Sequence, residues 1–255
     1  MRSTEPDRTV YSIVRGRPRL APRFRARRGS RRLGALADVT AVPVSTSSRR
    51  IQYWTFSDLS RSDDLPSAAL PVTYDLTFLS SRPVGWERAK THGHVHSGAE
   101  GEGFAELYEV LEGHVGFLVQ DLLPGPAASF AVLVEAHAGE SVVIPPRLHH
   151  AAVNLGSTML VLGDMVARRS QDDYASIRAA RGMSFYVALD GSVHPNPAYA
   201  GAPSLTRVRA PDWSDAPRGP LLTRLRADPS AFDWLSETGL FARLFPTLAA
   251  SYGCE

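Results

Sequence analysis

The sequence predicts an all-β protein, a barrel or a sandwich, and three observations lead to this class. Short runs rich in β-branched and aromatic residues recur from residue 51 onward. Turn signals such as Pro124-Gly125-Pro126, Gly113-His114 and Asn154-Leu155-Gly156 separate these runs. Helical periodicity is absent between them, so neighbouring strands are expected to pair with one another and close a sheet.

The expected strands follow in order along the middle of the chain. They are 51–56, 72–79, 104–111, 115–120, 130–135, 141–144, 151–154 and 159–162. The segment from Asp172 to Arg181 then predicts a short helix that Gly182 closes, and a further strand is expected over 184–189. We assign residues 49–194 to the barrel domain.

Both ends of the chain differ from the barrel in composition. Residues 195–220 are rich in proline, and Asp228-Pro229 then predicts the start of a helix. A loose apolar stripe follows, made of Phe232, Leu235, Leu240, Leu244 and Leu248. We therefore interpret residues 195–255 as a proline-rich linker followed by one or two helices.

The N-terminal segment is strongly basic. Residues 1–32 hold eleven arginines against only Glu5 and Asp7, with Pro18 and Pro22 among them. Such a run is typical of a disordered arm, which we place at residues 1–48. An arginine pair of an export signal would precede an apolar stretch, and residues 33–44 are too short and too interrupted for one. Contact of this arm with nucleic acid is not expected.

Composition limits the remaining classes. The chain has 255 residues, of which 44% are hydrophobic and 21% charged, which is ordinary for a globular protein. Its single cysteine, Cys254, excludes a disulfide within the chain and agrees with a reducing cytoplasm. No apolar run has the length of a membrane-spanning helix, so no contact with a membrane is expected.

A candidate metal site begins at His94 and His96. Alternate residues of a strand point to the same side, so both imidazoles can reach one ion without distortion of the backbone. Glu106 and His150 add a carboxylate and a third imidazole. Three histidines and one carboxylate suit Fe²⁺, Mn²⁺, Ni²⁺, Co²⁺ or Zn²⁺ and leave positions open for water or substrate. Tyr108 shares the strand face of Glu106 and is expected to line the same cavity.

The spacing of these residues resembles the two-part signature of the cupins, which are small β-barrels that bind a metal. Glu106 precedes Gly113 by seven positions, and the second half contains Gly139, Pro145, His150 and Asn154. Two glycines of the pattern are replaced, by Arg88 and Arg147. The signature selects His150 over the adjacent His149, whose side chain would face the opposite way. Of the carboxylates that compete with Glu106, Glu100 and Glu102 belong to an expected loop insertion over 97–103, and Glu109 faces the opposite side of its strand. We interpret His92, His114 and His137 as surface or turn residues.

Four segments resemble one cupin family more closely, the cupin-type glucose-6-phosphate isomerases of archaea and bacteria. They are 74–77, 90–96, 106–113 and 145–154, which read YDLT, KTHGHVH, ELYEVLEG and PPRLHHAAVN. The resemblance covers roughly residues 70–191. It implies one divalent ion on His94, His96, Glu106 and His150, with Fe²⁺ expected first and Mn²⁺, Ni²⁺ or Zn²⁺ as alternatives.

The resemblance also implies a reaction, the interconversion of glucose 6-phosphate and fructose 6-phosphate in glycolysis and gluconeogenesis. It implies a cytoplasmic homodimer whose substrate is a small sugar phosphate. Glu106 and Tyr108 are the implied catalytic residues, through either an enediol or a hydride shift. The implied substrate-binding residues are Thr77, Lys90, Thr91, Gly93 and Tyr174.

Two positions depart from the family. Val166 and Asp172 stand where it has a tyrosine and a histidine that bind substrate. An aspartate repels a phosphate, so either the phosphate lies elsewhere in the cavity, or the substrate is another sugar, or Asp172 faces away as a helix cap. Arg147 or Lys90 is expected to supply the missing positive charge. Three alternatives follow: a cupin oxygenase, an isomerase of another sugar, and a sugar-binding cupin without catalytic activity.

Overall fold

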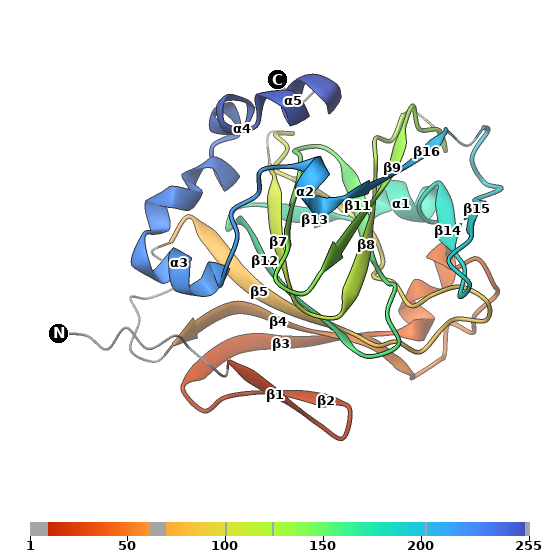
Figure 1. Cartoon of the computed structure of the whole chain (residues 1–255). Coiled ribbons are helices and arrows are strands. Elements are labelled where there is room, and N and C mark those ends of the chain that lie inside the picture. The colour runs from red at the N-terminus through yellow and green to blue at the C-terminus, as the bar shows by residue number, and fades with distance from the viewer. Residues whose placement is uncertain (1–9, 62–69, 100, 124, 202, 253–255) are drawn as a thin grey trace.

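Two sheets face each other and form a β-barrel in the computed structural model, which describes residues 10–61, 70–99, 101–123, 125–201 and 203–252 (Figure 1). The larger sheet has the strand order β10 (Ser141–Ile144), β7 (Glu106–Glu112), β12 (Leu160–Ala167), β5 (Val72–Leu79), β4 (Ile51–Arg61), β3 (Phe24–Arg32). The smaller sheet has the order β11 (His149–Asn154), β8 (His114–Gln120), β9 (Ala131–His137), β16 (Leu205–Arg209). The prediction of an all-β barrel is confirmed.

Short elements complete the fold. Three two-stranded pairs are β1 (Tyr11–Val14) with β2 (Arg17–Leu20), β6 (Val95–Ser97) with β13 (Gln171–Asp173), and β14 (Phe185–Val187) with β15 (Val193–Pro195). The helices are α1 (Ala175–Ala179), α2 (Ala210–Trp213), α3 (Leu221–Ala227), α4 (Thr238–Leu244) and α5 (Pro246–Tyr252), with 3₁₀ turns at η1 (Leu33–Val39) and η3 (Pro229–Leu235). None of the helices in the described part of the chain combines the length and apolarity that a membrane crossing requires.

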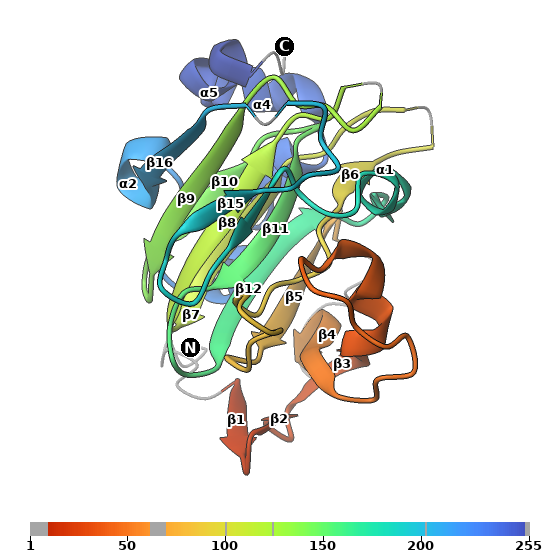
Figure 2. The ribbon, with the colours of Figure 1, turned by 90° about the vertical axis from the view of Figure 1, so that its right-hand side faces the viewer.

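The larger sheet is covered on both faces. Its inner face looks into the barrel, whereas the C-terminal helices and the β1–β2 hairpin lie against its outer side (Figures 1 and 2). Strand β12 is consequently buried along almost its entire length, and it reads as a nearly continuous apolar run with one aspartate, Asp164. Glu109 bonds outward rather than into the barrel, to the Tyr74 hydroxyl at 2.7 Å and to the Leu221 amide of α3.

The expectation of a disordered arm is wrong for residues 10–48. Strand β3 is the edge of the larger sheet and pairs with β4 from Phe24 to Arg32, and β1 and β2 form a hairpin beside it. Charge composition misled here because an edge strand carries arginines on both faces: Arg28 lies on the outer face over Phe56, and Arg31 lies on the inner face opposite Tyr53. Residues 1–9 and Cys254 lie outside the described residues.

The C-terminal region also contains more structure than a linker and two helices. Strand β16 pairs in parallel with β9 and covers its edge, so the proline-rich segment belongs to the smaller sheet. Trp213 of α2 donates from Nε1 to the Val143 carbonyl at 2.7 Å, which fastens this segment to β10. Four helical segments follow, and Phe232, Trp234 and Phe241 bury their rings among them.

Candidate metal centre

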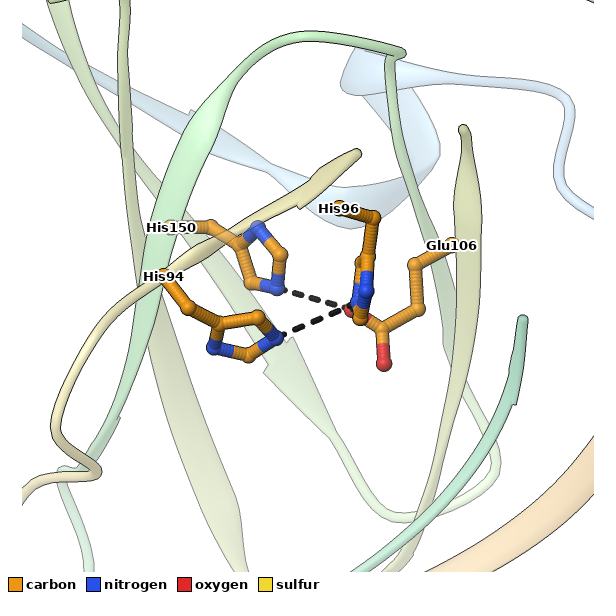
Figure 3. Close-up of side chains that lie close together, drawn as sticks. All are labelled: His94, His96, Glu106 and His150. Carbon is orange, nitrogen blue, oxygen red and sulfur yellow. Dashed lines mark hydrogen bonds and ion pairs between the residues drawn. The ribbon is translucent and has the colours of Figure 1, made fainter. Parts of the chain in front are cut away.

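Four side chains from three segments of the chain converge inside the barrel (Figure 3). They are His94 just before β6, His96 in β6, Glu106 at the start of β7 and His150 in β11. Oε2 of Glu106 lies 2.8 Å from Nε2 of His96 and 2.7 Å from Nε2 of His150. Nε2 of His94 lies 3.1 Å from that of His96, and all four donor atoms lie within 4.8 Å of one another.

The backbone explains this convergence. His94 and His150 bond each other through both amides and carbonyls, at 3.1 and 2.9 Å, which aligns the two segments. Gly93 has a φ of 85°, a conformation that side chains rarely adopt, and it turns the chain into this pairing. His149 points the other way, with its Nε2 2.9 Å from the Ser176 hydroxyl of α1.

The charges of the cluster are strongly coupled. Burial, together with the charges of His150 and His96, lowers the pKa of His94 to about 3, so this imidazole is neutral. Burial would also lower the pKa of His96, but the carboxylates of Glu106 and Asp172 outweigh it and raise that pKa to about 10. Although burial would raise the pKa of Glu106, the imidazoles of His96 and His150 hold that pKa well below its ordinary value. The cluster therefore contains an ionised carboxylate beside a protonated imidazole.

This donor set fits a divalent cation. The nitrogens of His94 and His96 point at each other, and two imidazoles share one oxygen of Glu106. A divalent ion accepts electron pairs from all four atoms at once, and imidazole with carboxylate is the ligand set of Fe²⁺, Mn²⁺, Ni²⁺, Co²⁺ and Zn²⁺. His94, His96, Glu106 and His150 are thus the residues that would hold the ion.

Asp172 lies beside the ligands and does not face away as a helix cap. Because β13 pairs with β6, Asp172 stands opposite His96, with Oδ1 3.3 Å from Nδ1 of that imidazole. The Tyr174 hydroxyl donates to Oδ2 at 2.6 Å. Asp173 accepts the Ala175 amide at 2.7 Å, and Tyr174 is the N-cap residue of α1. The expected helix from 172 begins only at Ala175, since residues 171–173 belong to β13.

A cavity of about 280 Å³ opens beside the ligand cluster. The register of the larger sheet arranges its side chains in rows across the strands. One row holds Arg31 and Tyr53, the next Thr55, Thr77 and Leu162, and the third Asp75, Asp164 and Tyr108. Arg31 therefore lies at one end of these rows and the carboxyls of Asp75 and Asp164 at the other, while Asp172 lines the cavity beside Tyr174, on the side of Arg31.

The carboxyls at the acidic end depart from their ordinary pKa. Burial, and then the negative charges of Glu106 and Asp75, raise the pKa of Asp164 well above its usual range. Burial also raises the pKa of Asp75, whose Oδ1 accepts the Asp58 amide at 2.8 Å. The Tyr108 hydroxyl lies 3.3 Å from Nε2 of His150, and burial raises its pKa well above 10, so it keeps its proton.

Comparison with known families agrees with this centre. Residues 27–203, more than half of the chain, match the family model described as "Glucose-6-phosphate isomerase (GPI)". The chain belongs to the glucose-6-phosphate isomerase family. The match begins within β3, so the family region includes the arginine-rich strand that composition alone assigned to an arm. No curated protein sequence matches this chain significantly.

Solved structures show more distant similarity to cupins. An oxalate decarboxylase from Lactobacillus farciminis in complex with formate shares 18% identity over 41% of this chain and 27% of its own, with a TM-score of 0.32. A cupin-2 domain protein from Shewanella frigidimarina shares 16% identity over 38% of this chain and 72% of its own, with a TM-score of 0.26. The match covers 41% of a recombinant oxalate oxidase, at a TM-score of 0.29. Similarity this low bears on no activity.

The structure brings together only part of the substrate-binding set that the sequence indicated. Thr77, Thr91 and Tyr174 line the cavity. Lys90 does not: its ammonium is buried between Glu87 and the Val39 carbonyl of η1. Gly93 is buried too, and a Cβ there would lie 3.4 Å from that of Ala151. Neither residue is among those that border the cavity.

The two replaced glycines of the cupin pattern have structural explanations. Arg147 keeps the left-handed conformation of a glycine, with a φ of 66°, and its exposed side chain lies outside the cavity. Arg88 donates to the carbonyls of Leu155 at 2.7 Å and Leu189 at 2.8 Å. Neither arginine supplies charge to the cavity, so the expectation placed on Arg147 is wrong.

The competing ligands lie elsewhere. Glu102 pairs with Arg169 at 3.4 Å, and Glu100 lies outside the described residues. His114 and His137 stack on each other with ring centres 4.0 Å apart. His92 is no surface residue: it is 2% exposed, lines the cavity and contacts the Tyr174 ring at 5.0 Å.

Sequence reasoning missed several further cavity residues, among them Arg31, Tyr53 and Asp164. One signal was available for Asp164, because a lone carboxylate within the apolar run 160–167 requires a polar partner inside the protein. Arg31 and Tyr53 carry no such signal alone. They become cavity residues only because β3 pairs with β4.

Proposed function

We propose that this protein is a metal-dependent aldose–ketose isomerase that interconverts glucose 6-phosphate and fructose 6-phosphate. One observation carries the proposal: a buried cluster of three histidines and one glutamate opens onto a polar cavity in a chain of the glucose-6-phosphate isomerase family. The cavity is of a size for one small ligand, and its polar lining suits a sugar better than an apolar molecule.

The reaction moves hydrogen between C1 and C2 of the open-chain sugar. A bound divalent ion supplies a Lewis acid that polarises the sugar oxygens at these carbons. The candidate base is Glu106, whose carboxylate lies at the centre of the cluster; its lowered pKa and its place among the metal ligands reduce its basicity, so both an enediol and a hydride route are open. Tyr108 keeps its proton and lies within reach of His150, so it orients or protonates a sugar oxygen.

Two routes are distinguished by solvent isotope. In the enediol route Glu106 takes a proton from one carbon and returns it to the other, so some exchange with D₂O is expected. A hydride shift transfers hydrogen directly and leaves the product without deuterium. Mass spectrometry of glucose 6-phosphate formed in D₂O therefore decides whether Glu106 acts as a base.

The sugar chain is proposed to lie along the rows of the larger sheet. Thr77 and Thr91 present hydroxyls to the cavity, and Tyr174 closes it beside His94 with ring centres 5.6 Å apart. Thr91 already accepts the Ala152 amide at 3.0 Å, which fixes its side chain and leaves its hydroxyl hydrogen free to donate to substrate.

The test is a reloading experiment. The purified protein is freed of metal, reloaded separately with Fe²⁺, Mn²⁺, Ni²⁺ or Zn²⁺, and assayed for conversion of fructose 6-phosphate in a coupled reaction. At least one loaded form is expected to be active. If every form holds metal and none converts the sugar, the isomerase assignment fails, and other sugars and oxygen consumption become the next measurements.

His150→Ala and His149→Ala form a matched pair for this test. Both remove a buried imidazole from adjacent positions of β11, but only His150 reaches Glu106. The first variant is expected to lose metal and activity, and the second to retain both. A homodimer, a cytoplasmic location and a place in glycolysis and gluconeogenesis stay predictions of the family resemblance.

A further inference from the structure

Arg31 is the one lysine or arginine among the described residues that line the cavity. Sequence reasoning sought a positive charge for the phosphate in Lys90 or Arg147, and the structure places both elsewhere. Arg31 comes from β3, the edge strand that pairs with β4, and stands opposite Tyr53 in the register. The inner face of the sheet thus carries a guanidinium where the cavity otherwise holds hydroxyls, aromatic rings and carboxyls.

The guanidinium is held in place with part of it unused. Nε donates to the Tyr53 hydroxyl at 3.2 Å, and the group lies over the Tyr174 ring at 5.1 Å from its centre. The two terminal nitrogens of Arg31 donate to no residue in the described part of the chain. A guanidinium fixed through Nε and a stacked face presents its remaining donors in a geometry that matches two oxygens of a phosphate.

The position of Arg31 suits a ligand that also reaches the metal ligands. Its guanidinium carbon lies 5.1 Å from the Tyr174 ring centre, which lies 5.6 Å from that of His94, so the guanidinium and His94 are at most about 10.7 Å apart. An extended six-carbon sugar with a terminal phosphate ester spans on the order of 10 Å, given bonds of about 1.5 Å. One molecule can therefore reach both.

The carboxyls of Asp75 and Asp164 also favour a phosphate at Arg31. Asp75 and Asp164 lie two rows along the sheet from Arg31, which corresponds to about 13 Å of strand. The row between holds Thr55 and Thr77, and Gly29 faces it from β3. A Cβ at Gly29 would lie 2.5 Å from the Thr55 hydroxyl, so the glycine keeps that hydroxyl free. A phosphate beside Arg31 lies away from the row of Asp75 and Asp164, and Asp172 is the one carboxylate among the described lining residues on the side of Arg31.

We propose that Arg31 binds the phosphate of the sugar phosphate and selects it over the unphosphorylated sugar. This inference rests on the proposed function for the identity of the substrate. The guanidinium supplies positive charge and two hydrogen-bond donors to the phosphate, as a lysine or histidine would supply charge at such a site. The adjacent threonine hydroxyls donate further hydrogen bonds. Asp172, which contacts His96 and Tyr174, remains compatible with an anionic ligand because Arg31 faces the same part of the cavity.

The test compares Arg31→Gln, Arg31→Lys and a control, Arg28→Gln. Arg28 lies three positions earlier in β3, is exposed, and covers Phe56 on the outer face, with 5.6 Å from its guanidinium carbon to the ring centre. Binding of fructose 6-phosphate and of fructose to the Zn²⁺-loaded proteins is measured by calorimetry, together with KM and kcat for isomerisation. Metal content and thermal unfolding are recorded for each variant.

Arg31→Gln is expected to weaken fructose 6-phosphate binding roughly 10- to 100-fold, with a matching rise in KM, and to leave fructose binding unchanged. Arg31→Lys keeps the positive charge but loses the paired N–H donors of the guanidinium, so its affinity for fructose 6-phosphate is expected to lie between those of Arg31→Gln and the unaltered protein. Arg28→Gln should match the unaltered protein. Equal loss for both sugars, or unaltered phosphate binding in both Arg31 variants, would overturn the role of Arg31.

The two proposals fail in different ways. If the unaltered protein binds fructose 6-phosphate and does not convert it, the isomerase assignment fails and the binding comparison still decides the role of Arg31. If it binds fructose 6-phosphate no better than fructose, the phosphate site itself is refuted. If it converts the sugar phosphate and Arg31→Gln converts it with unchanged KM, only the role of Arg31 fails.

Discussion

Replacing Asp172 by asparagine should weaken metal binding at the candidate centre about tenfold. Asp172 touches no donor atom of the cluster closely, yet its Oδ1 lies 3.3 Å from Nδ1 of His96, and Tyr174 fixes its other oxygen. Nδ1 of His96 is buried and forms no hydrogen bond among the described residues, so the Asp172 carboxylate at 3.3 Å is its charged neighbour. A carboxylate in this position orients the ring and makes its far nitrogen a better ligand, whereas an amide does so less well.

The expected loss of metal affinity depends on how exposed the Asp172 side chain is. Loss of such a supporting partner typically lowers metal affinity 10- to 100-fold. The Asp172 side chain is 45% exposed, so water screens part of its effect, and the lower end of that range is expected. Tenfold corresponds to about 1.4 kcal/mol.

The assay is competition for Zn²⁺ between the protein and a chromogenic chelator, at fixed pH and ionic strength. Asp173→Asn is the control, because Asp173 is the next residue and accepts the Ala175 amide at the start of α1 without contacting a histidine of the cluster. The Asp173 variant should keep the affinity of the unaltered protein. If Asp172→Asn also keeps it, or if both variants lose affinity equally, Asp172 does not support His96.

Two predictions concern stability. Phe241→Ala should lower the free energy of unfolding by about 3–5 kcal/mol, since the ring is fully buried against Phe245. Leu244→Ala, at a 59% exposed position of the same helix, should change it by less than about 1 kcal/mol. Similar losses for both variants in denaturant unfolding would contradict the packing of α4. Glu109→Gln should remove a pH dependence of the free energy of unfolding. Burial raises the folded-state pKa of Glu109 above its ordinary value of 4.5, so the unaltered protein loses stability as the pH rises from 4.5 through the folded-state pKa. The free energy of unfolding of Glu109→Gln, relative to that of the unaltered protein, should therefore increase with pH in this range. If the two free energies change with pH in parallel, the prediction is wrong.

Alternation along single strands made much of the barrel predictable. The expected strands at 72–79 and 141–144 coincide with β5 and β10, and the same two-residue period placed His94, His96 and Glu106 on inward faces. These features depend on neighbouring residues and on a fixed spacing, which a sequence displays directly.

Features created by pairing between distant strands were not predictable in this way. Arg31 looked like part of a solvated arm until β3 paired with β4, and Asp172 looked like a helix cap until β13 paired with β6. Lys90 was expected to reach substrate, but η1 supplies the Val39 carbonyl that buries it. In each case a contact far away in sequence decided where the side chain lies.

The central claim is that one divalent ion, held by His94, His96, Glu106 and His150, makes this protein an isomerase of glucose 6-phosphate. The most direct measurement is a titration of metal-free protein with the activating ion, followed by the initial rate of fructose 6-phosphate conversion. The rate should rise in proportion to the metal added and level off at one ion per chain. A rate that is absent at every ratio, or that is already maximal in protein shown to hold no metal, would contradict the account.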